Sequence, residues 1–175
     1  PEGGAMTATK NDKGSLRKLP RSLLVLSVPV PILAAVLIVA LFLIFQRSTS
    51  GDWAVHVDGQ GNVAFGSWWW LFLGTFILTS IAFLLGQYLA RDFSHLGHWY
   101  PMQKAIVILC FSTGYGFLGY LTANMSVALL APGSSGAEQL VGYGLLGFLL
   151  TAILAGSVYT ALLPKAQDTS ALHAF

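Results

Sequence analysis

The stretch that decides the fold class is residues 23–45, LLVLSVPVPILAAVLIVALFLIF, which contains no charged residue and no histidine. A transmembrane helix needs about 20 consecutive apolar residues, and this run is long enough. Seventeen of its residues are Leu, Ile, Val or Phe, which favours insertion by roughly 5 to 10 kcal/mol before its prolines and polar residues are counted. The run exceeds the apolar part of a secretory signal, about 7–15 residues, so it predicts a permanent membrane anchor.

Three further windows also lack Asp, Glu, Lys, Arg and His: residues 68–90, 105–130 and 140–163. Only 9% of the chain is charged, against about 25% in soluble domains. We therefore predict an all-α integral membrane fold, a four-transmembrane-helix bundle that forms one membrane domain over residues 21–164. The flanking residues 1–20 and 165–175 are expected to be cytoplasmic tails, and the first is expected to be flexible because it is polar and lacks periodicity.

The basic residues predict the orientation of this bundle. In a four-span arrangement, eight of the nine Lys and Arg residues fall on one side of the membrane, and only Arg47 falls on the other. The positive-inside rule makes the basic side cytoplasmic, so both termini are expected inside the cell. The net charge of +2 is explained by this asymmetry. It indicates attraction to anionic lipid headgroups, and we expect no nucleic-acid partner.

Residues 51–70, GDWAVHVDGQGNVAFGSWWW, connect the first two windows. Apolar and polar residues alternate over WAVHV, DGQGN has turn chemistry, and VAF can return, which predicts a small extracytoplasmic β-hairpin loop. An isolated hairpin is marginal in water, so Trp53 and Phe65 are expected to face the helix ends. Trp68 and the two tryptophans that follow it are expected at the outer membrane interface.

Two prolines, Pro29 and Pro31, lie in the cytoplasmic half of the first window. Each removes a backbone donor and disfavours straight helix at the preceding residue, which predicts a kink or a short unwound turn. A kink that fits the neighbouring helices is favoured over a gating hinge, because membrane helices tolerate proline where their neighbours restore the bonding.

Two glycine-rich octets match at six of eight positions: GYGFLGYL at residues 114–121 and GYGLLGFL at residues 142–149. Glycines within two helical turns allow close helix approach. The octets are expected at different depths, near mid-membrane and near the outer end, and are interpreted as a shared packing device without domain duplication. Asn124 should find a partner helix, a carbonyl or water. The helix-packing candidates are Gly114, Gly116, Gly119, Asn124, Gly142, Gly144 and Gly147.

Few residues suggest chemistry. Asp52, His56 and Asp58 would share one face of the first predicted strand, where an imidazole and carboxylates can bind zinc. A solvated histidine beside a turn-forming aspartate is the favoured alternative. His95 and His98, three residues apart, allow a metal or pH-sensing hypothesis, against the favoured alternative of interfacial polar residues. Because no window holds an ionisable acid or base and no catalytic motif is present, we predict no enzyme activity, cofactor or resident metal.

Residues 23–76 follow a recognisable order: a span, the extended segment VHVD at residues 55–58, a turn with Gly59 and Gly61, then Gly66-Ser67 and a second span. This order resembles the N-terminal membrane domain of bacterial SdpI-type immunity and signalling proteins. The resemblance implies a bacterial cytoplasmic (inner) membrane location, an immunity or signalling role, and an exposed hairpin with His56 as its most distinctive side chain.

These patterns together predict a non-catalytic integral membrane protein. It is expected to be an accessory or structural subunit of a larger membrane complex, or a small sensor or immunity protein. Its expected partners are membrane lipids and other integral membrane subunits, with Trp53, His56, Asp58 and Trp68 as contact candidates. The alternative is a self-associating small-solute transporter or channel, with Asn124, Gln87 and the glycine-rich faces lining the path.

Overall fold

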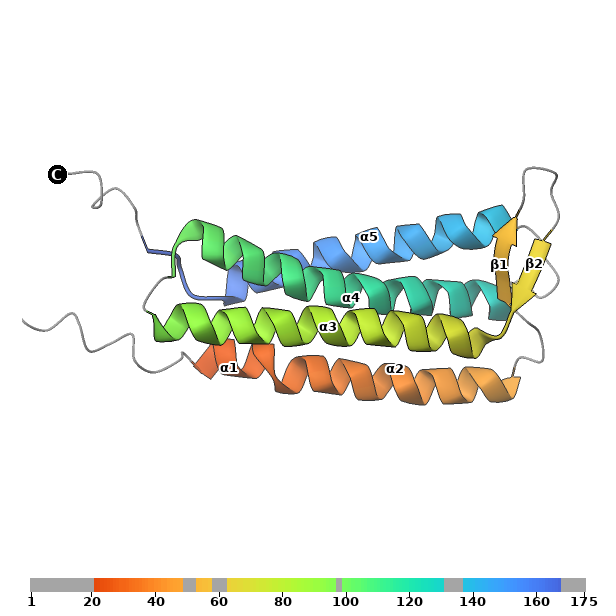
Figure 1. Cartoon of the computed structure of the whole chain (residues 1–175), viewed down its shortest axis with the longest axis horizontal. Coiled ribbons are helices and arrows are strands. Elements are labelled where there is room, and N and C mark those ends of the chain that lie inside the picture. Colours follow the sequence, from red (N-terminus) through yellow and green to blue (C-terminus); the bar gives the residue numbers. More distant parts are fainter. Residues whose placement is uncertain (1–20, 49–52, 58–62, 97–98, 131–136, 168–175) are drawn as a thin grey trace, which may run out of the picture.

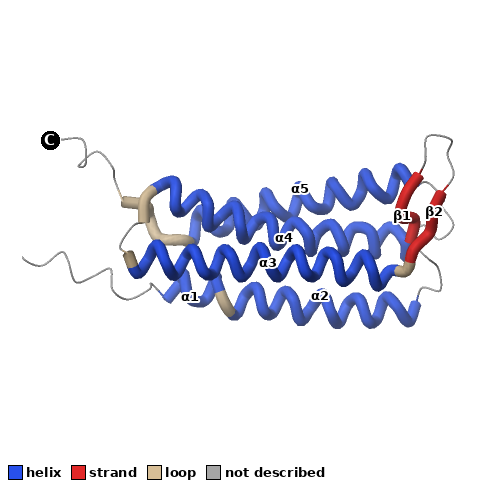
Figure 2. The backbone as a smooth tube through the Cα atoms, viewed as in Figure 1, coloured by secondary structure: helices blue, strands red, loops and turns tan. Residues whose placement is uncertain are grey.

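The structure, a computed structural model, describes residues 21–48, 53–57, 63–96, 99–130 and 137–167. Its elements in chain order are α1 (Arg21–Ser27), α2 (Pro29–Ser48), β1 (Trp53–Val57), β2 (Val63–Gly66), α3 (Trp68–His95), α4 (Pro101–Leu130) and α5 (Ala137–Leu162). The helices run along the long axis of the molecule, and the two strands lie at one end of it (Figure 1). Figure 2 shows how strongly helix dominates the backbone.

Four helices among the described residues are long and apolar enough to cross a membrane: Leu24–Ser48, Trp68–His95, Pro101–Leu130 and Gly142–Leu162. The prediction of four such helices is confirmed. The helix α3 runs past the predicted window to His95, and α4 already begins at Pro101, so the segment between them is short. The tails 1–20 and 168–175 lie outside the described residues, whereas residues 165–167 are described without helix or strand.

The first span is interrupted at Val28, which separates α1 from α2. Pro29 is the first residue of α2, a position where the missing N–H removes no intrahelical bond and the fixed φ suits the helix. The predicted kink or unwound turn is thereby confirmed. The break also leaves carbonyls at the end of α1 without their usual helical donors, because Pro29 and Pro31 have none.

Two short strands follow α2. The strands β1 and β2 pair antiparallel, with Trp53 opposite Gly66 and Val57 opposite Val63. The register shifts between Ala54 and His56, so strict two-residue alternation does not hold along β1. The turn that contains Asp58 lies outside the described residues. The helix α3 begins directly after β2, because the Ser67 side chain accepts a hydrogen bond from the Trp69 backbone N–H and caps its N-terminus.

The core runs along α4. This helix packs against α3 and α5, and α2 lies against α3 and α4. Near the strands, Phe42 of α2 stacks on Phe72 of α3 with ring centroids 4.2 Å apart. Nearer the other end, Phe111 of α4 stacks on Tyr159 of α5 at 4.9 Å. Two aromatic clusters therefore join the helices near opposite ends of the bundle.

Candidate functional site: the α4–α5 seam and two grooves

The two glycine-rich octets meet each other. A Cβ atom added to Gly119 would lie 2.5 Å from the Gly147 carbonyl oxygen, and one added to Gly147 would lie 2.6 Å from the Gly119 carbonyl oxygen. Real Cβ atoms do not approach so closely, so the two backbones touch and only glycine fits at this crossing. The prediction that the octets lie at different depths is wrong. Helices α4 and α5 are antiparallel, and the third glycines of the two octets, Gly119 and Gly147, lie side by side.

Each contact that α4 makes with α5 around this crossing has a counterpart that α5 makes with α4. Gly116 of α4 faces the Phe148 ring, 2.7 Å from an added Cβ, and Gly144 of α5 faces the Tyr120 ring at 2.6 Å. Phe148 and Tyr120 occupy the same position in their octets. In the same way, Thr151 beside Gly119 corresponds to Ala123 beside Gly147. These eight residues form what we call the α4–α5 seam, which has local two-fold pseudosymmetry: Gly116, Gly119, Tyr120, Ala123, Gly144, Gly147, Phe148 and Thr151.

The remaining candidate glycines differ from one another. An added Cβ on Gly114 would overlap the Phe83 ring of α3, so this glycine lets α3 approach α4. Gly142 has no atom within 4 Å of an added Cβ. The structure therefore uses five of the six candidate glycines for packing within the chain. The sequence contained the signal for their pairing, since helices with matching small-residue patterns can approach each other at matching positions.

Asn124 is fully buried between α4 and α5. Its side-chain Nδ2 donates a hydrogen bond of 2.8 Å to the Tyr120 carbonyl of its own helix, and it lies beside Gly144. Its Oδ1 has no hydrogen-bond partner among the described residues. The predicted carbonyl partner is present, and the amide lines neither of the two grooves described next.

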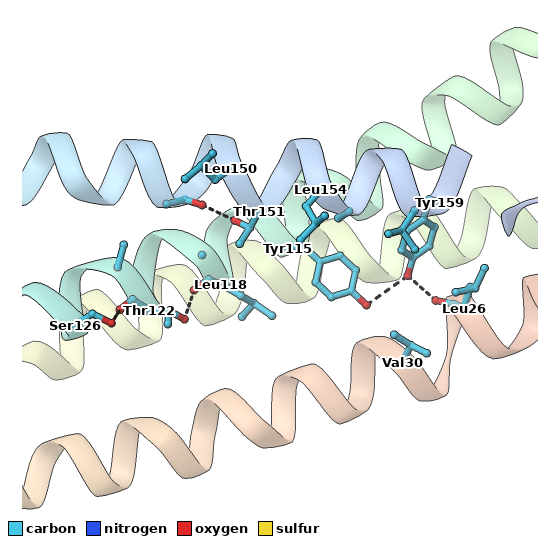
Figure 3. A pocket seen from close by; sticks show the side chains of 15 residues that line it. Leu26, Val30, Tyr115, Leu118, Thr122, Ser126, Leu150, Thr151, Leu154 and Tyr159 are labelled. Atoms are coloured by element: carbon cyan, nitrogen blue, oxygen red, sulfur yellow. Dashed lines mark hydrogen bonds between the residues drawn. The ribbon is translucent and has the colours of Figure 1, made fainter. Parts of the chain in front are cut away.

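Two grooves flank the seam. The first, the α2–α5 groove, has a volume of about 580 Å³ and lies between α1–α2 and α5, with α4 contributing to its lining (Figure 3). Its walls are formed by Leu26, Val30, Tyr115, Leu118, Gly119, Thr122, Ala123, Ser126, Gly147, Leu150, Thr151, Leu154, Ala155, Val158 and Tyr159. The second, the α3–α5 groove, has a volume of about 670 Å³. It is formed by Gly66, Trp70, Leu71, Gly74, Thr75, Leu78, Phe117, Tyr120, Leu145 and Phe148.

The polar groups of the α2–α5 groove gather around two tyrosines. The Tyr159 hydroxyl donates a hydrogen bond of 2.6 Å to the Leu26 carbonyl at the end of α1. The Tyr115 hydroxyl oxygen lies 3.4 Å from the Tyr159 hydroxyl oxygen. Figure 3 shows these three groups in a row at one end of the groove. Tyr159 thus satisfies a carbonyl next to the proline break and ties α1 to α5, a role that the sequence reading missed.

At the end of the bundle opposite the strands, a lysine caps the C-terminus of α5, which the sequence patterns did not predict. The Lys104 ammonium donates to the Thr160 carbonyl at 3.1 Å and to the Leu163 carbonyl at 3.3 Å. A positive charge there stabilises the C-terminus of α5, where the helix dipole is negative. The Trp99 indole N–H donates to the Pro164 carbonyl at 3.1 Å. Lys104 and Trp99 therefore join the start of α4, and the residues before it, to the end of α5.

The structure describes only some of the contact candidates in and beside the hairpin. Trp53 and His56 lie in β1, and Asp58 lies outside the described residues. Trp68 is buried, with its ring edge against Phe45 at 4.8 Å, whereas Trp70 is exposed. Of the tryptophan triplet, the first residue thus belongs to the core. Within the described part of the chain, no group of three or more His, Cys, Asp or Glu residues is placed to hold a metal ion.

The chain matches no family model, and comparison with curated proteins and with solved structures gives no match. The resemblance to SdpI-type proteins therefore stays a prediction.

Proposed function

We propose that this chain is a non-catalytic, multi-pass protein of a bacterial cytoplasmic membrane, and that it serves as an accessory or structural subunit of a larger membrane complex. A small sensor or immunity protein is a second form of the same proposal. In either form, the bundle spans the membrane, both termini are cytoplasmic, and the β1–β2 hairpin is presented on the outer side.

The unequal packing of the helices carries the proposal. In the most apolar window of α4, 44% of residues are buried within the chain, against 22% for the first span and 6% for α5. The glycines through which α5 approaches another helix closely lie in the seam. The rest of the α5 surface is a broad face of large aliphatic side chains. These exposed residues are Leu145, Leu146, Leu149, Leu150, Ile153, Leu154, Val158 and Leu162. A face of this kind suits contact with lipid or with another membrane subunit.

The positions of the charges support the orientation. Arg91 and Lys104 lie at the end of the bundle opposite the strands, and the N-terminal tail that precedes α1 carries further basic residues. The positive-inside rule favours this end as cytoplasmic. Labelling with a membrane-impermeant maleimide tests this in variants that lack Cys110. Arg47→Cys should react in intact cells, and Lys165→Cys should react only after the cells are opened.

A self-associating transporter or channel is the alternative function. The two grooves are lined almost entirely by carbon, and their threonine and serine hydroxyls bond to carbonyls of their own helices. A polar path needs donors and acceptors that face the solute along its length, whereas these surfaces supply them only at the Tyr115 and Tyr159 hydroxyls at one end of the α2–α5 groove. Solute flux through vesicles that contain a homo-oligomer of this chain would favour the alternative.

Co-purification tests the subunit role. The tagged full-length chain is extracted from its native membrane in a mild detergent, and the bound chains are identified by mass spectrometry. We expect a defined membrane partner whose recovery falls several-fold in Ile153→Trp, on the exposed face of α5. Ile81→Trp, at an exposed position of α3, is the matched control and should retain the partner. A chain that is always recovered alone as a monomer would contradict the subunit proposal.

A further inference from the structure

The α2–α5 groove has one closed end and one open side. The hydrogen bond between Tyr159 and Leu26 joins the two walls at the closed end. Away from this bond, α2 diverges from α5 (Figure 3), and the wall residues Leu150 and Leu154 are exposed. A molecule lying in a bilayer could therefore enter from the side, with its apolar part along the leucines and its other end at the tyrosines.

Almost every hydroxyl group in this groove already donates its proton to a backbone carbonyl. Thr122, Ser126 and Thr151 each donate to a carbonyl three or four residues earlier in their own helix. The single proton of Tyr159 is directed to the Leu26 carbonyl, so Tyr159 can only accept from its neighbour.

Tyr115 is the exception. The Tyr159 oxygen beside its hydroxyl is 3.4 Å away, beyond the range of about 2.5–3.0 Å for a good O–H···O hydrogen bond. The Tyr115 hydroxyl is therefore the donor in this wall that a bound acceptor can engage at shorter distance.

We propose that the α2–α5 groove binds a neutral lipid-like molecule, with its long apolar chain along Leu118, Leu150 and Leu154 and a carbonyl oxygen accepting a hydrogen bond from Tyr115. The volume of about 580 Å³ falls within the usual range for small-molecule sites, about 300–1,000 Å³. The head group must be neutral, because none of the fifteen lining residues is Asp, Glu, Lys, Arg or His, and a buried charge without a partner is costly.

The same carbonyl chemistry occurs in isoprenoid quinones and in the esters of acylglycerols. Both place an acceptor oxygen at the end of an apolar chain, and both reach the groove through the bilayer. The site rests on the proposed placement of α2 and α5 in a membrane. It does not rest on the subunit role, because ligand binding is measured on the solubilised chain alone and the subunit role by co-purification.

Native mass spectrometry of the detergent-solubilised full chain tests the site with decylubiquinone, dioleoylglycerol and, as a hydrocarbon lacking an acceptor, squalene. We expect at least one carbonyl probe to bind more tightly than squalene. Loss of one neutral hydrogen bond in Tyr115→Phe should weaken that probe by about threefold to tenfold. Tyr88→Phe, at an exposed position of α3, should bind it like the parent chain. Ala155→Phe, which fills the groove, should lose it.

The outcomes separate cleanly. Binding of decylubiquinone alone identifies the source as a quinone, and binding of dioleoylglycerol alone identifies it as an ester lipid; either supports the site. Equal affinities in Tyr115→Phe and Tyr88→Phe would overturn the hydrogen bond to Tyr115, even if Ala155→Phe fails to fold. Absence of binding by every probe, or binding of squalene as tightly as the carbonyl probes, would overturn the proposal.

Discussion

Helix α5 meets α4 backbone to backbone, whereas α2 meets α3 ring to ring. At the α4–α5 seam, Gly119 and Gly147 let two carbonyls touch the opposite helix. On the other side, Phe42 and Phe45 reach across to Phe72 and Trp68, because α2 stays farther from its neighbours. In lipid, where large side chains gain little from being buried between helices, close backbone approach and interlocking rings are two separate ways to gain dispersion energy.

The largest effect is expected where the backbones touch. Gly119→Leu should destabilise the bundle by about 3 kcal/mol or more, because an overpacked side chain has no space to move into. Unfolding of the purified protein in mixed detergent measures the free energy. Gly142→Leu is the matched control, since an added Cβ there meets no atom within 4 Å. Similar losses in the two variants would refute the seam.

The aromatic attachment of α2 should be the next most sensitive. Phe42 is fully buried, so Phe42→Ala should cost about 2 kcal/mol, less than the 3–5 kcal/mol typical of water-soluble cores. The reduction follows because lipid solvates an exposed ring better than water does. The neighbouring Leu43 is exposed, and Leu43→Ala should change the unfolding free energy very little. If the two variants behave alike, α2 is not held by these rings.

The hydroxyl that ties α1 to α5 gives a smaller and more local effect. Tyr159→Phe removes the hydrogen bond to the Leu26 carbonyl, worth about 1 kcal/mol. Hydrogen exchange should speed up several-fold in α1 and at the start of α2, with little change in the α4–α5 seam. Tyr88→Phe serves as the control. Faster exchange spread evenly over all helices would argue against a local tie.

The charge at the end of α5 should have the smallest effect. Lys104→Met removes the donor to the Thr160 and Leu163 carbonyls and should cost about 0.3–1 kcal/mol through the helix dipole. The exposed Lys165 provides the comparison, and Lys165→Met should be neutral. If Lys104→Met left the unfolding free energy unchanged, the ammonium would not stabilise α5, and its role would be limited to orienting the bundle in the membrane.

The number of helices and the break in the first span follow from local chemistry, and both were predictable. Four uncharged windows specify four long apolar helices, and two prolines specify an interruption close to Pro29. The pairing of the octets could not be predicted from their positions within the two windows, although their matching glycines contained that information.

Contacts between distant segments were beyond the reach of sequence patterns. Trp68 and Trp70 are identical in type, and only the start of α3 at the Ser67 cap decides that one is buried and the other exposed. Likewise, nothing local to Tyr159 indicates that its hydroxyl meets Leu26. The α2–α5 groove could not be predicted because it depends on how far α2 diverges from α5.

The bond between Tyr159 and Leu26 also constrains the order of assembly. During synthesis α1 emerges before the other described helices, but its partner on α5 lies 133 residues later in the chain and is made after them. The helices α4 and α5, neighbours in sequence, can pair as soon as both exist, since contacts between nearby segments close fastest. The α1 end of this span is therefore tied to α5 only after the other described helices have been made, whereas α2 can pack on α3 as soon as α3 exists.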